Sequence, residues 1–153
     1  MKSLLIAIVL YSRMAFAVEI ASEQMNQLRD LKGGTYNSAQ GKDLRLLYFW
    51  ATWCPNCKEK MKGPLQEVAK WPETQLLLVS TEKDLALVKN FVEKEGLSFE
   101  VFADITKTVR KALNITAVPA WALLKKNGNS FEVLGSDIGF EEDAIKKLLP
   151  SKK

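Results

Sequence analysis

The sequence predicts a single α/β domain with a central mixed β-sheet flanked by helices on both faces. Short apolar runs of strand length alternate with helical segments, and "NGN" at 127–129 is a strong hairpin signal between the last two runs. The chain of 153 residues is 47% hydrophobic and 26% charged, as expected of one globular domain. It shows no internal repeat, linker or low-complexity segment.

The first half of the predicted domain contains the first strand and the first long helix. Residues 18–43 are polar, and "LKGGTY" within them suggests a turn that leads into a short extended piece. "LRLLYF" at 44–49 is an apolar run of strand length. A helical pattern runs from Pro55 to Lys70, with proline tolerated in its first turn, and the Gly63–Pro64 pair should interrupt it.

The middle of the chain repeats the strand–helix alternation. "QLLLVS" at 75–80 has the apolar character of a buried strand. Thr81 and Asp84 form a pattern like a capping box before a helix that should end at Gly96. A third strand and a short helix follow at 99–104 and 106–114.

The C-terminal part is predicted to be a hairpin and a helix. The hairpin strands are "AWALLKK" at 120–126 and "SFEVLG" at 130–135. An amphipathic helix is expected at 141–149. Its inner face should consist of Ala144, Ile145, Leu148 and Leu149.

The first 17 residues have the features of an export signal. A lysine near the start precedes a short apolar run at 4–11, and "AFA" at 15–17 is a small-x-small cleavage site. The mature single domain would then be 18–153, located in the periplasm or otherwise outside the cytoplasm. Arg13 is unusual so close to a cleavage site, so an uncleaved membrane anchor remains the alternative.

The charge of the mature chain argues against nucleic acid as a partner. The full sequence has 22 basic and 18 acidic residues, a net charge of +4, and two of the basic residues lie in the leader. The remaining excess of about +2 is too small for an electrostatic nucleic-acid footprint.

The only two cysteines, Cys54 and Cys57, form a Cys-x-x-Cys motif in "FWATWCPNCKEK". A haem attachment site would need histidine after the second cysteine, where Lys58 stands. The chain has no histidine, so a zinc or copper site would lack its usual nitrogen ligands, and no metal is expected. A disulfide across so few residues closes almost no loop, so it makes a poor structural staple.

A peroxide-reducing cysteine is a further alternative, but its usual upstream Pro and Thr pattern is missing. Thiol–disulfide exchange is the chemistry that remains. The motif follows a strand and begins a helix, so Cys54 should lie near the helix N-terminus, where the unpaired N–H groups lower the pKa of a thiol. Cys57 lies one turn further along and should be less exposed. Cys54 would attack a substrate disulfide and Cys57 would resolve the mixed disulfide, with no cofactor beyond this cysteine couple.

On these motifs the chain resembles the thioredoxin superfamily, and in particular its exported TlpA/ResA/CcmG-type branch. The matching segments are "DLKGGTY", "GKDLRLLYFWATWCPNCKEKM", "LLLVSTEKD" and "FEVFADITKTVRKALNITAVPAWALLKKNG". The resemblance implies a thioredoxin-like fold and a cis-proline loop beside the cysteines, at Pro119. It further implies that the Val118 backbone pairs with the substrate chain, and that Trp53 covers the cysteine pair. Expected partners are disulfide-containing client proteins and a membrane-bound thiol reductase that supplies electrons.

One departure from the superfamily concerns proton handling. Thioredoxins carry a buried aspartate six residues before the first cysteine, and this chain has Tyr48 there. A neutral phenol is a poor base at neutral pH. Glu59 and Glu82 are the nearest alternative carboxylates, although a solvated helix face is sufficient to explain each of them.

A second departure concerns the direction of electron flow. Pro55 removes a backbone N–H that could stabilise the Cys54 thiolate, and Asn56 is neutral, so neither supplies the positive charge of a strongly oxidising site. We therefore expect a protein-disulfide reductase, acting for example in cytochrome c or metal-centre maturation. The alternatives are a DsbA-like oxidant and a non-catalytic thioredoxin-fold module that senses redox state. Trp50 is expected in the core; Trp121 is expected either in the core or along the substrate groove.

Overall fold

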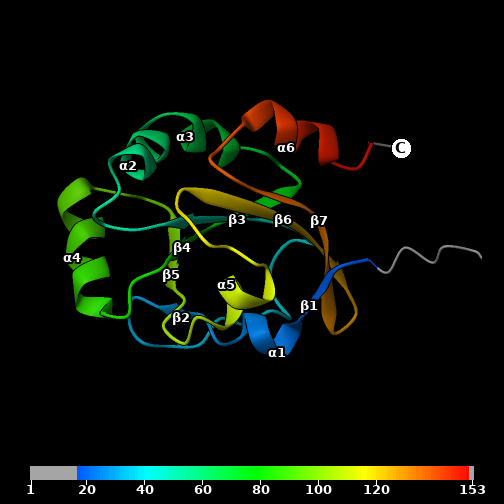
Figure 1. Ribbon diagram of the computed structural model, residues 1–153, viewed down its shortest axis with the longest axis horizontal. Coiled ribbons are helices and arrows are strands. Elements are labelled where there is room, and N and C mark those ends of the chain that lie inside the picture. The colour runs from blue at the N-terminus through cyan, green and yellow to red at the C-terminus, as the bar shows by residue number, and fades with distance from the viewer. Residues whose placement is uncertain (1–16, 152–153) are drawn as a thin grey trace, which may run out of the picture.

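A computed structural model describes residues 17–151, which form a seven-stranded sheet with helices on both faces (Figure 1). The expected export signal lies outside the described residues, apart from Ala17. None of the helices within 17–151 has the length and apolar character needed to cross a membrane. The elements are β1 (Glu19–Ala21), α1 (Ser22–Met25), β2 (Arg29–Asp30), β3 (Leu44–Trp50), α2 (Pro55–Lys62), α3 (Pro64–Val68), β4 (Thr74–Ser80), α4 (Leu85–Glu95), β5 (Glu100–Ala103), α5 (Thr108–Ala112), β6 (Ala120–Asn127), β7 (Ser130–Ile138) and α6 (Glu142–Leu148).

The sheet is mixed, as predicted. Its strand order is β1-β7-β6-β3-β4-β5-β2. The three strands β3, β4 and β5 run parallel, while β6 lies antiparallel to β3 and pairs with β7 as the expected hairpin. Because β3, β4 and β5 are parallel, their carboxyl ends lie at the same edge of the sheet, where ligands and substrates typically bind.

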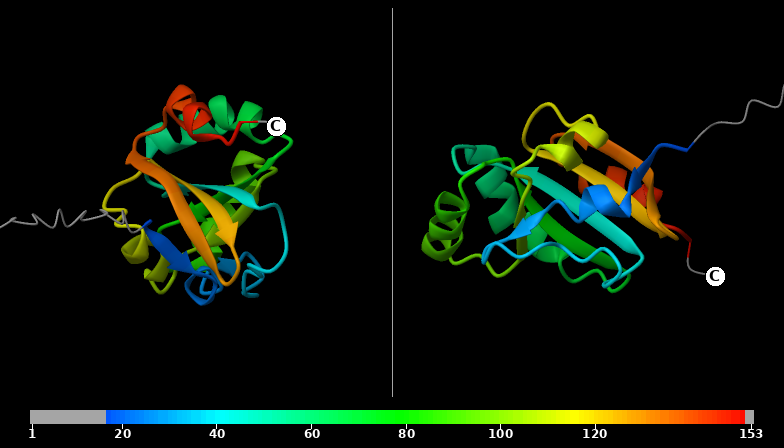
Figure 2. Two further views of the ribbon diagram at one scale, coloured as in Figure 1. Left: turned by 90° about the vertical axis from the view of Figure 1, so that its right-hand side faces the viewer. Right: turned by 90° about the horizontal axis from the view of Figure 1, so that it is seen from below.

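Helices cover both faces of the sheet, so the central strand is buried along its whole length. In β3, Tyr48 and Trp50 face a cluster that includes residues of α2, α3, α4 and α6. Leu47 and Phe49 face the opposite cluster, to which α1 and α5 contribute. Figures 1 and 2 show these two layers of helices on either side of the sheet. Such two-sided burial explains why β3 is an uninterrupted apolar run rather than an alternating one.

The helices agree with one sequence prediction and differ from two others. The break at Gly63–Pro64 is confirmed, since α2 ends at Lys62 and α3 begins at Pro64. The start of α4 differs from the predicted capping box, because Asp84 alone is the N-cap and Thr81 takes no part. The Asp84 carboxylate accepts the N–H groups of the second and third helical residues at 2.9 and 3.3 Å. In α6 the inner face is narrower than predicted.

The buried face of α6 consists mainly of one residue. Ile145 is fully buried, whereas Ala144 is exposed and Leu148 is 37% exposed. The helix has only seven residues, so it offers little more than one buried position to the core.

The segment before β3 contains structure that the sequence did not predict. β1, at the sheet edge, pairs antiparallel with β7, and α1 follows it directly. β2 has only two residues and pairs with β5. Strands this short carry no recognisable alternation of polar and apolar residues, because their position is set by partners far along the chain.

An ion-pair cluster joins α2 to α4 and gives a pH-dependent contribution to stability. Glu95 accepts hydrogen bonds from Lys58 and Lys62, each at 2.7 Å, and these bonds lower the pKa of its carboxyl to about 2. Because the folded-state pKa lies below the unfolded one, the contribution is complete above the unfolded pKa and is lost as the pH falls from about 4.5 to about 2.

We therefore expect Glu95→Gln to lower the free energy of unfolding near pH 6, and we expect this difference to shrink steadily as the pH falls toward 2. Urea unfolding of both proteins at intervals across this pH range measures the difference. The exposed pair of Glu67 and Lys70 provides the control, since Glu67→Gln should give a small difference. A Glu95→Gln difference that does not change with pH would contradict this assignment.

Candidate active site

The cysteine motif lies at the carboxyl end of β3 and begins α2. Cys54 and Cys57 form a disulfide, with their Cα atoms 5.3 Å apart. Cys54 is the N-cap of α2, and its sulfur accepts the backbone N–H of Cys57 at 3.2 Å. Pro55 occupies the first helical position, where its missing N–H leaves no intrahelical bond unmade. The predicted position of Cys54 at the helix N-terminus is confirmed.

The two cysteines differ in exposure in the predicted sense. Cys57 is fully buried, and Cys54 retains 5% of its surface. The dipeptide between them, Pro55 and Asn56, is exposed. An incoming sulfur therefore reaches Cys54 more readily than Cys57.

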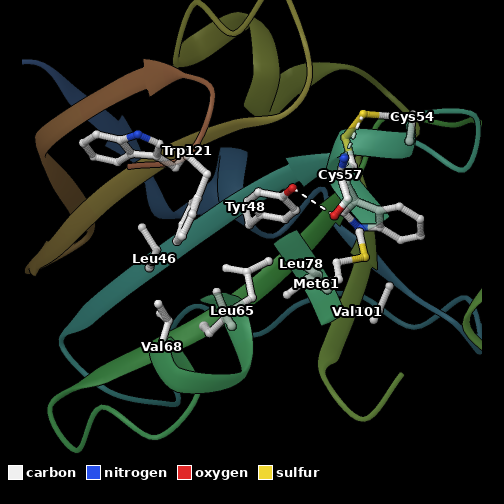
Figure 3. Packing of buried hydrophobic residues seen from close by; sticks show 14 of the residues in the cluster. Leu46, Tyr48, Cys54, Cys57, Met61, Leu65, Val68, Leu78, Val101 and Trp121 are labelled. Carbon is white, nitrogen blue, oxygen red and sulfur yellow. Dashed lines mark hydrogen bonds between the residues drawn. A yellow bond between two sulfur atoms is a disulfide. The ribbon is translucent and has the colours of Figure 1, made fainter. Parts of the chain in front are cut away.

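Tyr48 lies directly beneath the motif, in the position where thioredoxins have a buried acid. Its hydroxyl donates a hydrogen bond to the backbone carbonyl of Cys57 at 3.1 Å (Figure 3). The ring is fully buried, and this burial strongly raises the pKa of the phenol. Tyr48 is therefore a neutral donor that holds the first turn of α2 against β3, and it does not supply a base for Cys57.

The proline loop lies beside the cysteine motif, as the sequence predicted. β6 begins at Ala120, which pairs with Phe49 near the end of β3. Val118 and Pro119 therefore lie next to the residues that lead into the motif. The Val118–Pro119 peptide bond is cis. The role of Val118 in pairing with a substrate chain stays a prediction.

The tryptophans divide clearly into core and surface residues. Trp50 is fully buried and Trp121 is 4% exposed, and both belong to the core cluster around the motif. Figure 3 shows Trp121 in this cluster. The alternative that Trp121 lines the substrate groove is therefore wrong. Trp53, next to Cys54, is 72% exposed and lines a surface pocket together with Val118.

Glu82 holds the loop that precedes the cysteines. It follows the end of β4, and its carboxylate accepts the backbone N–H of Thr52 at 2.8 Å and the Thr52 hydroxyl. Its second oxygen accepts the Ser80 hydroxyl at 2.8 Å. The explanation of Glu82 as part of a solvated helix face is wrong, because the residue precedes α4 and is half-buried. Glu59, by contrast, is exposed on α2.

Removing the Glu82 carboxylate should therefore loosen the turn before Cys54. We expect Glu82→Ala to lower the free energy of unfolding by about 2 kcal/mol, because charge-assisted hydrogen bonds contribute more than neutral ones and the Thr52 N–H loses its acceptor. Glu59→Ala, which deletes an exposed carboxylate on α2, should change it by less than about 0.5 kcal/mol. Urea unfolding of the oxidised proteins measures both values, and equal effects would contradict the role given to Glu82.

Two residues near the motif, Thr52 and Glu82, were thus not predicted as a pair. The signal that could have found them is topological. Parallel neighbouring strands end at one edge of the sheet, so polar residues just after β4 lie beside those just after β3. Within the described part of the chain, no group of three or more cysteine and carboxylate side chains is placed to hold a metal ion.

Comparison with known proteins agrees with this geometry. Residues 19–129 match the model of the AhpC/TSA family. The thiol–disulfide oxidoreductase ResA of Geobacillus kaustophilus is 31% identical over 130 residues, which cover 82% of this chain and 73% of ResA. The soluble secreted antigen MPT53 of Mycobacterium tuberculosis is 26% identical over 117 residues, covering 75% of this chain and 67% of MPT53.

A solved structure gives the same result at the level of the fold. The structure of DsbF from Mycobacterium tuberculosis, in mixed oxidised and reduced forms, superposes with a TM-score of 0.63 at 26% identity. The superposition covers 82% of this chain and 93% of DsbF.

Proposed function

We propose that this chain, which belongs to the AhpC/TSA family and is a thiol–disulfide oxidoreductase of the ResA type, reduces protein disulfides outside the cytoplasm. The observation that carries the proposal is the unequal environment of the two cysteines. Cys54 caps α2 and retains some exposure, while Cys57 is buried one turn further along the helix. The redox group is the protein's own disulfide.

The reduced protein acts in two exchange steps. The Cys54 thiolate attacks one sulfur of a client disulfide, forming a mixed disulfide and releasing the first client thiolate. The Cys57 thiolate then attacks the Cys54 sulfur, forming the intramolecular disulfide and releasing the second client thiolate. The client gains two electrons and, from water, two protons, while the protein is oxidised. A membrane-bound thiol reductase would return two electrons to the Cys54–Cys57 couple.

The surroundings of Cys54 favour its role as nucleophile. In the oxidised form the Cys57 N–H already points at the Cys54 sulfur, and after reduction the same N–H would stabilise a thiolate. Val118 and Pro119 lie where they would align the client backbone, and Trp53 would contact the client beside the disulfide.

The direction of electron flow is inferred from the residues between and around the cysteines. Pro55 offers no N–H, Asn56 is neutral, and the chain has no histidine, so the site lacks the groups that stabilise the reduced form of a strong oxidant. The proposed location outside the cytoplasm rests on the sequence of residues 1–17 and is supported by the secreted relative MPT53.

The equilibrium of the Cys54–Cys57 couple with glutathione tests the direction. A reduction potential of about −200 mV or lower supports the reductase, whereas a value near about −120 mV, as in DsbA, would establish an oxidant instead. Insulin reduction with a supplied dithiol tests turnover separately. An absence of turnover would indicate a non-catalytic module that senses redox state.

A further inference from the structure

A small pocket adjoins the cysteine motif at the carboxyl edge of the parallel strands. Its volume is about 170 Å³. This is below the roughly 300–1,000 Å³ typical of sites for whole small molecules, and it suits a single side chain. The pocket is lined by Trp53, Thr81, Arg110, Ile115, Thr116, Ala117 and Val118.

Arg110 is the only charged residue among those that line the pocket. Its side chain is 17% exposed, and its Nε lies 3.4 Å from an oxygen of the buried Asp104. Asp104 is already engaged, because its two carboxylate oxygens accept the backbone N–H groups of Val109 at 3.2 Å and of Arg110 at 2.8 Å. Asp104 therefore fixes the position of the Arg110 guanidinium but does not pair with all of the N–H groups of that guanidinium.

One guanidinium nitrogen of Arg110 lacks a hydrogen-bond partner within residues 17–151. The buried Nη2 makes no hydrogen bond. Arg45, which is fully buried, shows the contrast. Its Nε and Nη2 donate to three backbone carbonyls at 2.8–3.0 Å, and its Nη1 donates to the Tyr36 hydroxyl. Arg45 is thus a structural cation, whereas Arg110 has one unpaired guanidinium nitrogen, buried next to the pocket that the residue lines.

We propose that this pocket binds a carboxylate side chain of the client protein, within a few residues of the cysteine that Cys54 attacks. A carboxylate is the group that matches the planar fork of a guanidinium, and a low-exposure arginine strengthens such a bond. The inference rests on the proposed function, because the client must lie along Val118 for its side chain to enter the pocket.

The position of the pocket determines which side chain of the client would enter it. Trp53 directly precedes Cys54, and Val118 is the residue expected to pair with the client backbone. Both line the pocket, so a client strand that pairs with Val118 presents there a side chain close to its own cysteine. The site would therefore select clients with Asp or Glu next to the target disulfide.

Reduction of synthetic peptide disulfides tests this selectivity. Each peptide has one cysteine and forms a symmetrical disulfide. Two residues precede the cysteine and two follow it; one of these four positions is Glu and the other three are Gln. The dithiol form of the protein should reduce at least one Glu peptide about tenfold faster than the all-Gln peptide at low salt.

Two variants with the same loss of charge distinguish the pocket from general attraction. Arg110→Gln should remove the preference for Glu, measured as the ratio of the rates with the Glu peptide and the all-Gln peptide. Lys111→Gln, an exposed change on the same helix, should keep the preference. Arg110→Lys keeps a cation beside Asp104 without the planar fork and should retain less than half of the preference, so the test holds even if Arg110→Gln does not fold.

The outcomes separate this inference from the proposed function. If the peptides are reduced without preference for Glu at any position, or if Arg110→Gln keeps the preference, the carboxylate site is overturned and the reductase stands. If neither the peptides nor insulin are reduced, the proposed function itself fails, and the inference fails with it.

Discussion

Replacing Cys57 with serine is expected to trap the mixed disulfide between Cys54 and the client. Cys54 can still attack, but the buried thiol that would displace the client is gone, so turnover should fall by at least about a thousandfold. Intact-mass analysis of the reduced variant, mixed with a peptide disulfide, should show the mass of one added peptide. A reducing agent should remove it.

Cys54→Ser is the matched control for this experiment. The sulfur that remains belongs to Cys57, which is fully buried in the first turn of α2, so no adduct should accumulate. Loss of turnover in both variants with an adduct only in Cys57→Ser supports the assigned order of attack. An adduct in Cys54→Ser alone would reverse the roles of the two cysteines.

Replacing Arg45 with methionine should cause the largest loss of stability away from the site, about 3 kcal/mol of unfolding free energy. Arg45 is fully buried on β3, and its guanidinium lies 4.6 Å from the centre of the Phe131 ring. Methionine fills part of the space but donates no hydrogen bond, so the carbonyls of Ser38, Gln40 and Lys42 lose their common donor. Buried acceptors left without a partner cost about 1–3 kcal/mol each, and those near the surface regain water.

Arg29→Met provides the comparison at a half-buried arginine. Arg29 donates a single side-chain hydrogen bond, at 3.3 Å to Asn26, so its loss should cost less than about 1 kcal/mol. Urea unfolding of the three oxidised proteins measures both differences. A loss for Arg45→Met no greater than that for Arg29→Met would show that the loop before β3 does not depend on the buried cation.

The features that the sequence predicted correctly are those with a local signal. The helix that begins at Pro55, the interruption at Gly63–Pro64 and the hairpin at 127–129 each depend on residues within a few positions of one another. The proline loop was located through a family resemblance, and the pairing of Ala120 with Phe49 explains why the loop lies at the motif.

The features that were missed depend on contacts between distant parts of the chain. Glu82 looks like a residue of a solvated helix until the parallel pairing of β3 and β4 places it beside Thr52. Arg110 lies in a short, basic helical segment, and only the folded chain brings it next to Trp53. In both cases the charged residue is visible in the sequence, but the residue beside it in the fold, Thr52 for Glu82 and Trp53 for Arg110, is 30 or more positions away.

The arrangement of the sheet edges has a consequence for the order in which the domain can be completed. Both outer strands, β1 and β2, come from the beginning of the described chain, but their partners β7 and β5 come much later, as the pairing of Glu19 with Glu132 shows. β2 can therefore pair only after β5 has been synthesised, and β1 only after almost the whole domain exists, a topology that slows folding. Until β5 has paired with β2 and β7 with β1, both strands keep an open edge that can pair with other chains, so these two N-terminal strands protect the sheet from association.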